Sequence, residues 1–95
     1  MKIGVPKCIN ITTKGTAGEI TTLVFEKLVY SIQIKNKGNS KLYVSFDFGE
    51  TWIELDPGEE IKVEPFVTKS KQKPIVLIKS DGTNEPVRVI YRLIE

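Results

Sequence analysis

The sequence predicts an all-β protein: an antiparallel β-sandwich or small barrel of about seven strands, Ig-like in size. Three observations predict it. Apolar and polar residues alternate with a period of two, turn-forming residues separate the alternating runs, and no segment has a convincing helical period. The length of 95 residues fits a single β domain spanning residues 1–95.

The alternation is clearest in four runs, residues 30–35, 41–47, 60–64 and 87–93. Each run places its apolar side chains on one face and its polar side chains on the other, as expected for strands with one buried and one solvated face. Residues 74–78 are apolar throughout, which predicts a central strand covered on both faces.

The segments between the runs contain turn-forming residues. Residues 36–39 join the first pair of strands. In residues 56–59, Pro57 and Gly58 take the second and third positions of a turn, as a type II turn requires. The Asp-Gly pair at residues 81–82 indicates a hairpin between the last two strands. This spacing predicts a meander or Greek key closed into a sandwich or barrel.

The first third of the chain gives a weaker signal. Residues 8–12 alternate and predict a strand, with Cys8 as a small buried hydrophobe. Residues 20–29 favour another strand, although residues 25–28 also fit a helical turn. Residues 1–7 are predicted to form a flexible N-terminal arm.

Composition excludes several classes of function. The formal charge of +2, from 14 basic and 12 acidic residues, argues against a nucleic-acid partner. The chain has no histidine, which removes the commonest general base and metal ligand, so we expect no catalytic residue, metal or cofactor. A single cysteine excludes an internal disulfide and fits synthesis in a reducing compartment. No apolar run has the ~20 residues that span a bilayer, so we expect no membrane partner.

One short motif stands out in residues 45–52, whose sequence reads S-x-D-x-G-x-T-W. It resembles the Asp-box hairpin of sialidases and other β proteins. A carboxylate can accept hydrogen bonds from the amides of the following turn, glycine permits a positive φ, and the tryptophan ring can cover the turn. These residues are therefore expected to form a structural hairpin rather than a site. They are Ser45, Asp47, Gly49, Thr51 and Trp52.

Phe48 lies at the tip of this hairpin, where a small or polar residue would suit the turn better. Two interpretations remain open: the ring contacts a partner, or it folds onto a neighbouring loop. Lys69, Lys71 and Lys73 alternate along an extended segment and would form a basic stripe. The stripe either contacts an acidic partner or protects a sheet edge, and protection is favoured. With Phe66, these residues complete the candidate interface.

Acidic residues gather after the hairpin, and their spacing matches neither a calcium loop nor a facing pair of catalytic carboxylates. A solvated acidic rim is the favoured interpretation. The residues are Glu50, Glu54, Asp56, Glu59 and Glu60.

A broader resemblance covers residues 29–94: the turn at residues 36–39, the hairpin at residues 45–52, the L-D-P-G-E turn at residues 55–59 and the final alternating run. In this layout the chain resembles small β-sandwich virion proteins of tailed bacteriophages, such as head decoration proteins. The resemblance implies a non-enzymatic structural protein that is made in the host cytoplasm. It would dock on the capsid or tail lattice of the virion, often as an oligomer.

Two rival functions remain. A carbohydrate- or cell-surface-binding module would use an aromatic platform formed by Phe48, Trp52, Tyr43 and Phe66. A small carboxylate-based hydrolase would need a pocket with two converging acids, and it is the least favoured of the three.

Overall fold

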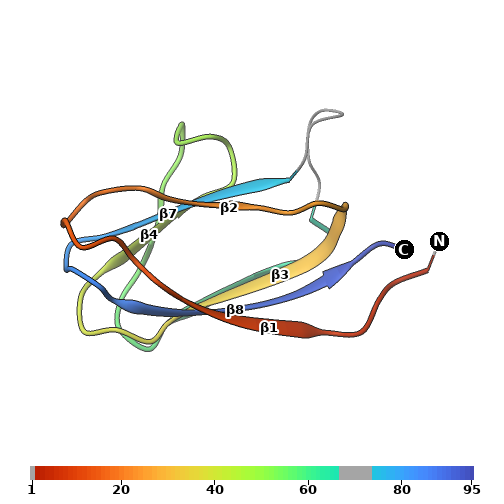
Figure 1. Cartoon of the computed structure of the whole chain (residues 1–95), viewed down its shortest axis with the longest axis horizontal. Helices are drawn as coiled ribbons and strands as arrows, with labels where there is room; N and C mark the ends of the chain where they lie inside the picture. Colours follow the sequence, from red (N-terminus) through yellow and green to blue (C-terminus); the bar gives the residue numbers. More distant parts are fainter. Residues whose placement is uncertain (1, 67–73) are drawn as a thin grey trace.

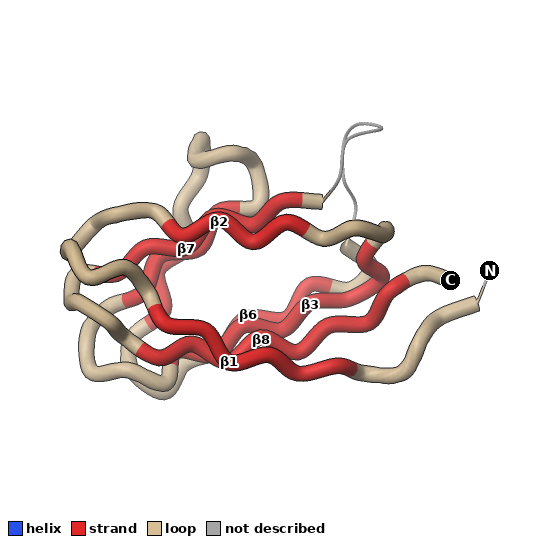
Figure 2. Tube along the Cα trace, viewed as in Figure 1, coloured by secondary structure: helices blue, strands red, loops and turns tan. Residues whose placement is uncertain are grey.

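The computed structural model describes residues 2–66 and 74–95, and this part of the chain contains eight β-strands and no helix. The strands pack as two facing four-stranded sheets (Figures 1 and 2). One sheet has the order β1-β8-β3-β6 and the other the order β2-β7-β4-β5. The strands are β1 Lys7–Thr12, β2 Thr21–Val24, β3 Val29–Asn36, β4 Leu42–Ser45, β5 Ile53–Leu55, β6 Glu60–Val63, β7 Ile75–Ser80 and β8 Pro86–Leu93.

The strand order defines the fold as a jelly roll, because nearly every connection crosses from one sheet to the other. Among the strands of the described residues, only β4 and β5 are consecutive and pair within one sheet. The predicted all-β sandwich is confirmed, with eight strands rather than about seven. The hairpin expected at residues 81–82 is wrong, since β7 and β8 lie in different sheets, and the turn at residues 36–39 likewise joins strands of different sheets.

The core lies between the two sheets and follows from the alternation. Eight aliphatic side chains from four strands are at most 1% exposed: Ile32, Ile34, Val87 and Val89 on one side, and Leu42, Val44, Val76 and Ile78 on the other. Each strand presents every second residue to the opposite sheet, so apolar alternation is enough to identify most of these positions.

The strand expected at residues 74–78 begins at Ile75 and is an inner strand of its sheet, between β2 and β4. Its inward residues, Val76 and Ile78, are fully buried, whereas Ile75 and Leu77 on the outer face are half-buried. The outer face is thus only partly covered. Leu77 lies beneath the loop that joins β4 to β5, because a Cβ added at Gly49 would lie 3.7 Å from the Leu77 Cδ1.

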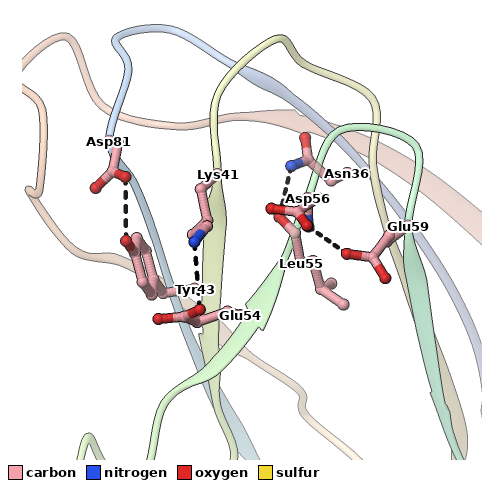
Figure 3. Close-up of polar contacts among 8 residues, drawn as sticks. All are labelled: Asn36, Lys41, Tyr43, Glu54, Leu55, Asp56, Glu59 and Asp81. Carbon is pink, nitrogen blue, oxygen red and sulfur yellow. Dashed lines mark hydrogen bonds and ion pairs between the residues drawn. The ribbon is translucent and has the colours of Figure 1, made fainter.

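Two turns at one end of the sandwich are held together by Asn36, which is fully buried. Its side-chain amide donates to the carbonyl of Ser40 at 2.8 Å. It also donates to the carbonyl of Leu55 at 2.9 Å (Figure 3). In the turn that follows β5, Gly58 has a φ of 87° and the Glu59 amide donates to the Asp56 carbonyl, as expected for the predicted type II turn.

Residues 2–4, within the segment predicted as a flexible arm, lie beside the C-terminal end of β8 (Figure 1). The Gly4 amide donates to the Leu93 carbonyl at 2.8 Å, and Arg92 Nε donates to the Gly4 carbonyl at 2.9 Å. Farther along, residues 25–28 form a bend between β2 and β3 rather than a helical turn. Cys8 is exposed on β1, an edge strand, so its predicted burial is wrong.

Candidate functional site: the loop between β4 and β5

The β4–β5 connection stands out from the sandwich, on the outer side of the β2-β7-β4-β5 sheet (Figures 1 and 2). It comprises residues 46–52 and follows Ser45, the fully buried last residue of β4. We call residues 45–52 the tip loop. The loop contains the residues that the sequence motif singled out.

A compact network of hydrogen bonds fixes the tip loop. Ser45 Oγ donates to Asp47 Oδ1 at 2.8 Å and accepts from the Gly49 amide at 2.7 Å. The same carboxylate oxygen of Asp47 accepts from the Thr51 amide at 2.8 Å. One buried hydroxyl and one carboxylate therefore satisfy the Gly49 and Thr51 amides, the backbone donors that follow the tip.

These bonds favour the charged form of Asp47. The Thr51 amide is the largest cause and the Ser45 hydroxyl the second, and together they lower the pKa of the Asp47 carboxyl below its ordinary value. Asp47 therefore acts as a charged acceptor within the loop, which suits a structural role and leaves little capacity for proton transfer near neutral pH.

The tip itself has an unusual backbone. Phe48 has a φ of 59° and Gly49 a φ of 90°, so two consecutive residues are left-handed. Glycine adopts this region at no steric cost, but for a bulky residue it is an outlier that costs about 1–2 kcal/mol. The Phe48 side chain nevertheless remains 62% exposed, so the ring does not fold onto a neighbouring loop.

Trp52 closes the base of the tip loop. A Cβ added at Gly49 would lie 3.5 Å from the Trp52 Cζ2, so the indole lies directly beside the turn. The Lys79 ammonium lies 4.3 Å from the centre of the Trp52 ring, within cation–π range. Trp52 therefore links the tip loop to strand β7.

Phe66, a second candidate interface residue, does not join this site. Phe66 is 9% exposed and packs edge-on against Phe46 with ring centres 5.6 Å apart, so its prediction as a surface residue is wrong. The Phe66 backbone amide donates to the Tyr30 carbonyl, which holds residue 66 against β3. Lys69, Lys71 and Lys73 lie outside the described residues.

The predicted aromatic platform is also divided. Phe66 belongs to the core and Phe48 to the tip, whereas Tyr43 and Trp52 are half-buried with Lys79 near both rings. No pattern in the sequence relates Lys79 to either ring. Alternation places the Tyr43 side chain on the outer face of the sheet, opposite to Leu42 and Val44. Lys79 lies beside Tyr43 only because β4 pairs with β7.

The acidic residues after the loop are exposed and spread over strands and turns. Glu54 pairs with Lys41 at 3.3 Å, and Glu59 accepts from the Asp56 amide at 2.8 Å (Figure 3). In residues 2–66 and 74–95, no group of three or more histidine, cysteine or acidic side chains is arranged to hold a metal ion. No helix in these ranges is long and apolar enough to cross a membrane.

Comparison with known proteins supports the fold. No protein-family model and no curated protein sequence matches the chain. Among solved structures, it is similar to the solution NMR structure of a de novo designed double-stranded β-helix, with a TM-score of 0.57 and 17% identity. The match covers 93% of this chain and 97% of the designed one. The chain therefore has the double-stranded β-helix, or jelly-roll, fold, and the likeness extends to the fold alone.

Proposed function

We propose that this protein is a non-enzymatic docking module that contacts a protein partner through Phe48, as a structural component of a phage virion. The single observation that carries the docking step is the state of Phe48. A bulky, exposed aromatic side chain occupies a left-handed backbone position on a loop that is otherwise fixed by hydrogen bonds.

The energetics favour a role for the ring outside the fold. Glycine or asparagine at this position would relieve the backbone strain. The ring recovers little through burial, because most of its surface remains in water. Aromatic residues that become buried in a partner's pocket contribute strongly to binding, and a preformed loop lowers the entropic cost of docking.

A non-enzymatic role is supported by the placement of the acidic residues. The Asp47 carboxylate accepts from the Thr51 amide and the Ser45 hydroxyl of its own loop, and Glu54 is paired with Lys41. A hydrolase using two carboxylates would need them to face each other across a cleft, an arrangement that the exposed acids after the tip loop do not form.

The assignment to a phage virion depends on the resemblance of residues 29–94 to small virion proteins and on analogy between folds. Jelly rolls serve in viral capsids, but also in lectins and cupins, so the fold alone does not choose among them. A lattice would compensate for a small contact surface, since many identical sites raise the total avidity.

The test uses particles of the phage that encodes the chain. We expect the protein to be detected by immunoblot in density-purified particles, and purified wild-type protein to rebind particles stripped of it. Phe48→Ala should weaken rebinding at least about tenfold, the loss expected for a hot-spot aromatic. Leu28→Ala is the matched control, because Leu28 is a 54% exposed hydrophobe outside the tip loop.

Two results would contradict the proposal at different levels. Absence of the protein from all particles would remove the virion assignment. Equal rebinding by wild type and Phe48→Ala would remove Phe48 as the contact residue.

A further inference from the structure

A second feature of the same sheet is a pocket on its outer side, separate from Phe48. The pocket has a volume of about 300 Å³ and is lined by Gly18, Tyr43, Lys79, Ser80 and Asp81. This volume is the share of about ten water molecules in the liquid, which leaves room for one small ligand. It lies at the lower end of the range for small-molecule sites.

The pocket is built by contacts between segments far apart in the sequence. Tyr43 on β4 pairs in register with Lys79 on β7. The Gly18 amide donates to the Ser80 carbonyl at 2.8 Å, which holds the β1–β2 connection against the end of β7. Ser80 is 2% exposed, and its hydroxyl donates to the Lys41 carbonyl and accepts from the Gly82 amide. The walls are therefore largely preformed.

Two polar groups of opposite charge line the opening. The Tyr43 hydroxyl donates to Asp81 Oδ2 at 3.0 Å, which orients the carboxylate at the rim (Figure 3). The Lys79 ammonium lies 5.7 Å from the centre of the Tyr43 ring and 4.3 Å from that of Trp52. Among the described residues, ion pairs join Lys2 with Glu95, Lys41 with Glu54 and Lys62 with Glu64, and Lys79 is in none of them.

This combination selects a class of ligand. Lys79 offers hydrogen-bond donors and Asp81 offers acceptors, so a ligand should carry groups that both accept and donate, as hydroxyls do. The two charges balance. A carboxylate or phosphate ligand would face the Asp81 carboxylate, and an amine would face the Lys79 ammonium. The aromatic wall of Tyr43 suits a ligand with an apolar face as well as a polar rim.

We propose that this pocket binds one neutral pyranose residue of a glycan, with its apolar face against Tyr43 and its hydroxyls between Lys79 and Asp81. This site goes beyond the docking function and does not depend on it, because Phe48 does not line the pocket. The docking test can fail while this one succeeds, and the reverse also holds.

The experiment is a titration of the isotope-labelled full chain, followed through its backbone amide resonances. The probes are the methyl pyranosides of glucose, galactose, mannose and N-acetylglucosamine, with glucuronate and glucosamine as charged counterparts. We expect at least one neutral probe to shift the amides of Gly18, Lys79, Ser80 and Asp81, with a dissociation constant of about 1–10 mM, as befits a single small site.

Two variants test the assigned contacts. Asp81→Asn should weaken binding about tenfold by replacing the charged acceptor, and Tyr43→Phe should weaken it several-fold by releasing Asp81. Asp56→Asn and Tyr30→Phe make the same chemical changes away from the pocket and should leave binding unchanged. Asp81 is exposed, and Asp81→Asn keeps the hydrogen bond from the backbone amide of residue 81 to the Lys41 carbonyl. This variant should therefore fold.

Three results would overturn the proposal. The first is that no neutral probe shifts the pocket amides of the wild type. The second is that a charged probe binds as tightly as the best neutral one. The third is that Asp81→Asn binds like the wild type. The wild-type shift map remains decisive even if a variant fails to fold.

Discussion

The tip loop and the pocket lie on the same sheet, but the chain encodes them in different ways. The tip loop is local: its hydrogen bonds join residues two to four positions apart, such as Ser45 with Gly49 and Asp47 with Thr51. The pocket is non-local, because the Tyr43–Asp81 bond spans 38 positions. Local order is specified by residue type and spacing, whereas the pocket exists only once β4 and β7 are in register.

The largest expected difference between the two regions concerns their buried serines. Ser45→Ala should lower the free energy of unfolding by about 2–3 kcal/mol, because it leaves the Gly49 amide without its acceptor and removes one of the two donors to Asp47 Oδ1. Ser80→Ala should cost less, about 1 kcal/mol, because its bonds are longer, at 3.2 and 3.1 Å.

Urea unfolding would measure both changes, with Thr83→Ala, an exposed residue, as the control expected within about 0.5 kcal/mol of wild type. A loss at Ser80 equal to or greater than that at Ser45 would show that the tip loop is not the more tightly specified region.

The two regions are joined by Trp52 and Lys79. A double-mutant cycle of Trp52→Leu and Lys79→Gln should give a coupling energy of about 0.5–1 kcal/mol, the value expected for a cation–π contact at a half-exposed site. The same cycle with Lys62→Gln, on the opposite sheet, should give none. A zero coupling for the first pair would mean that the loop and the pocket are energetically independent.

The smallest effect is the pH dependence of the tip loop. The pKa of Asp47 in the folded state lies below the ordinary value of 3.8. The stabilisation from its charged form is therefore complete above about pH 3.8 and is lost as the pH falls through the folded-state pKa.

Asp47→Asn lacks this titration. Its thermal unfolding midpoint should approach that of the wild type as the pH falls from 5 towards 2, following the titration window of a carboxyl group with a lowered pKa. A gap between the two proteins that stays constant over this range would contradict the assigned hydrogen bonds. Thr83→Ala, an exposed substitution that removes no titratable group, is the control and should stay parallel to the wild type over this range.

The sequence allowed prediction of the sheet character, most of the core and the tip loop because each depends on short-range pattern. Alternation identifies Leu42 and Val44 as inward-facing, and the spacing of Ser45, Asp47 and Gly49 predicts their local bonding. The jelly-roll connections were missed because a turn such as that at residues 81–82 has the same composition whether it joins strands within a sheet or between sheets.

The same limit applies to single residues. Phe66 and Phe48 are both phenylalanines next to turns, and nothing local separates the buried one from the exposed one. The sequence pattern identifies Asn36 only as a turn residue, but its side chain holds two turns together through a carbonyl 19 positions away. The pocket depended on the pairing of Tyr43 with Lys79, which no short-range pattern specifies.

The most direct test of the central claim, that Phe48 is kept in a strained position for its exposed ring, is the unfolding free energy of Phe48→Gly beside that of Phe48→Ala. Phe48→Gly should be more stable than wild type by about 0.5–1 kcal/mol, since relief of the left-handed strain exceeds the entropic cost of glycine. Phe48→Ala keeps the strain and should match wild type within about 0.5 kcal/mol. A loss of stability in both variants would instead show that the ring serves the fold.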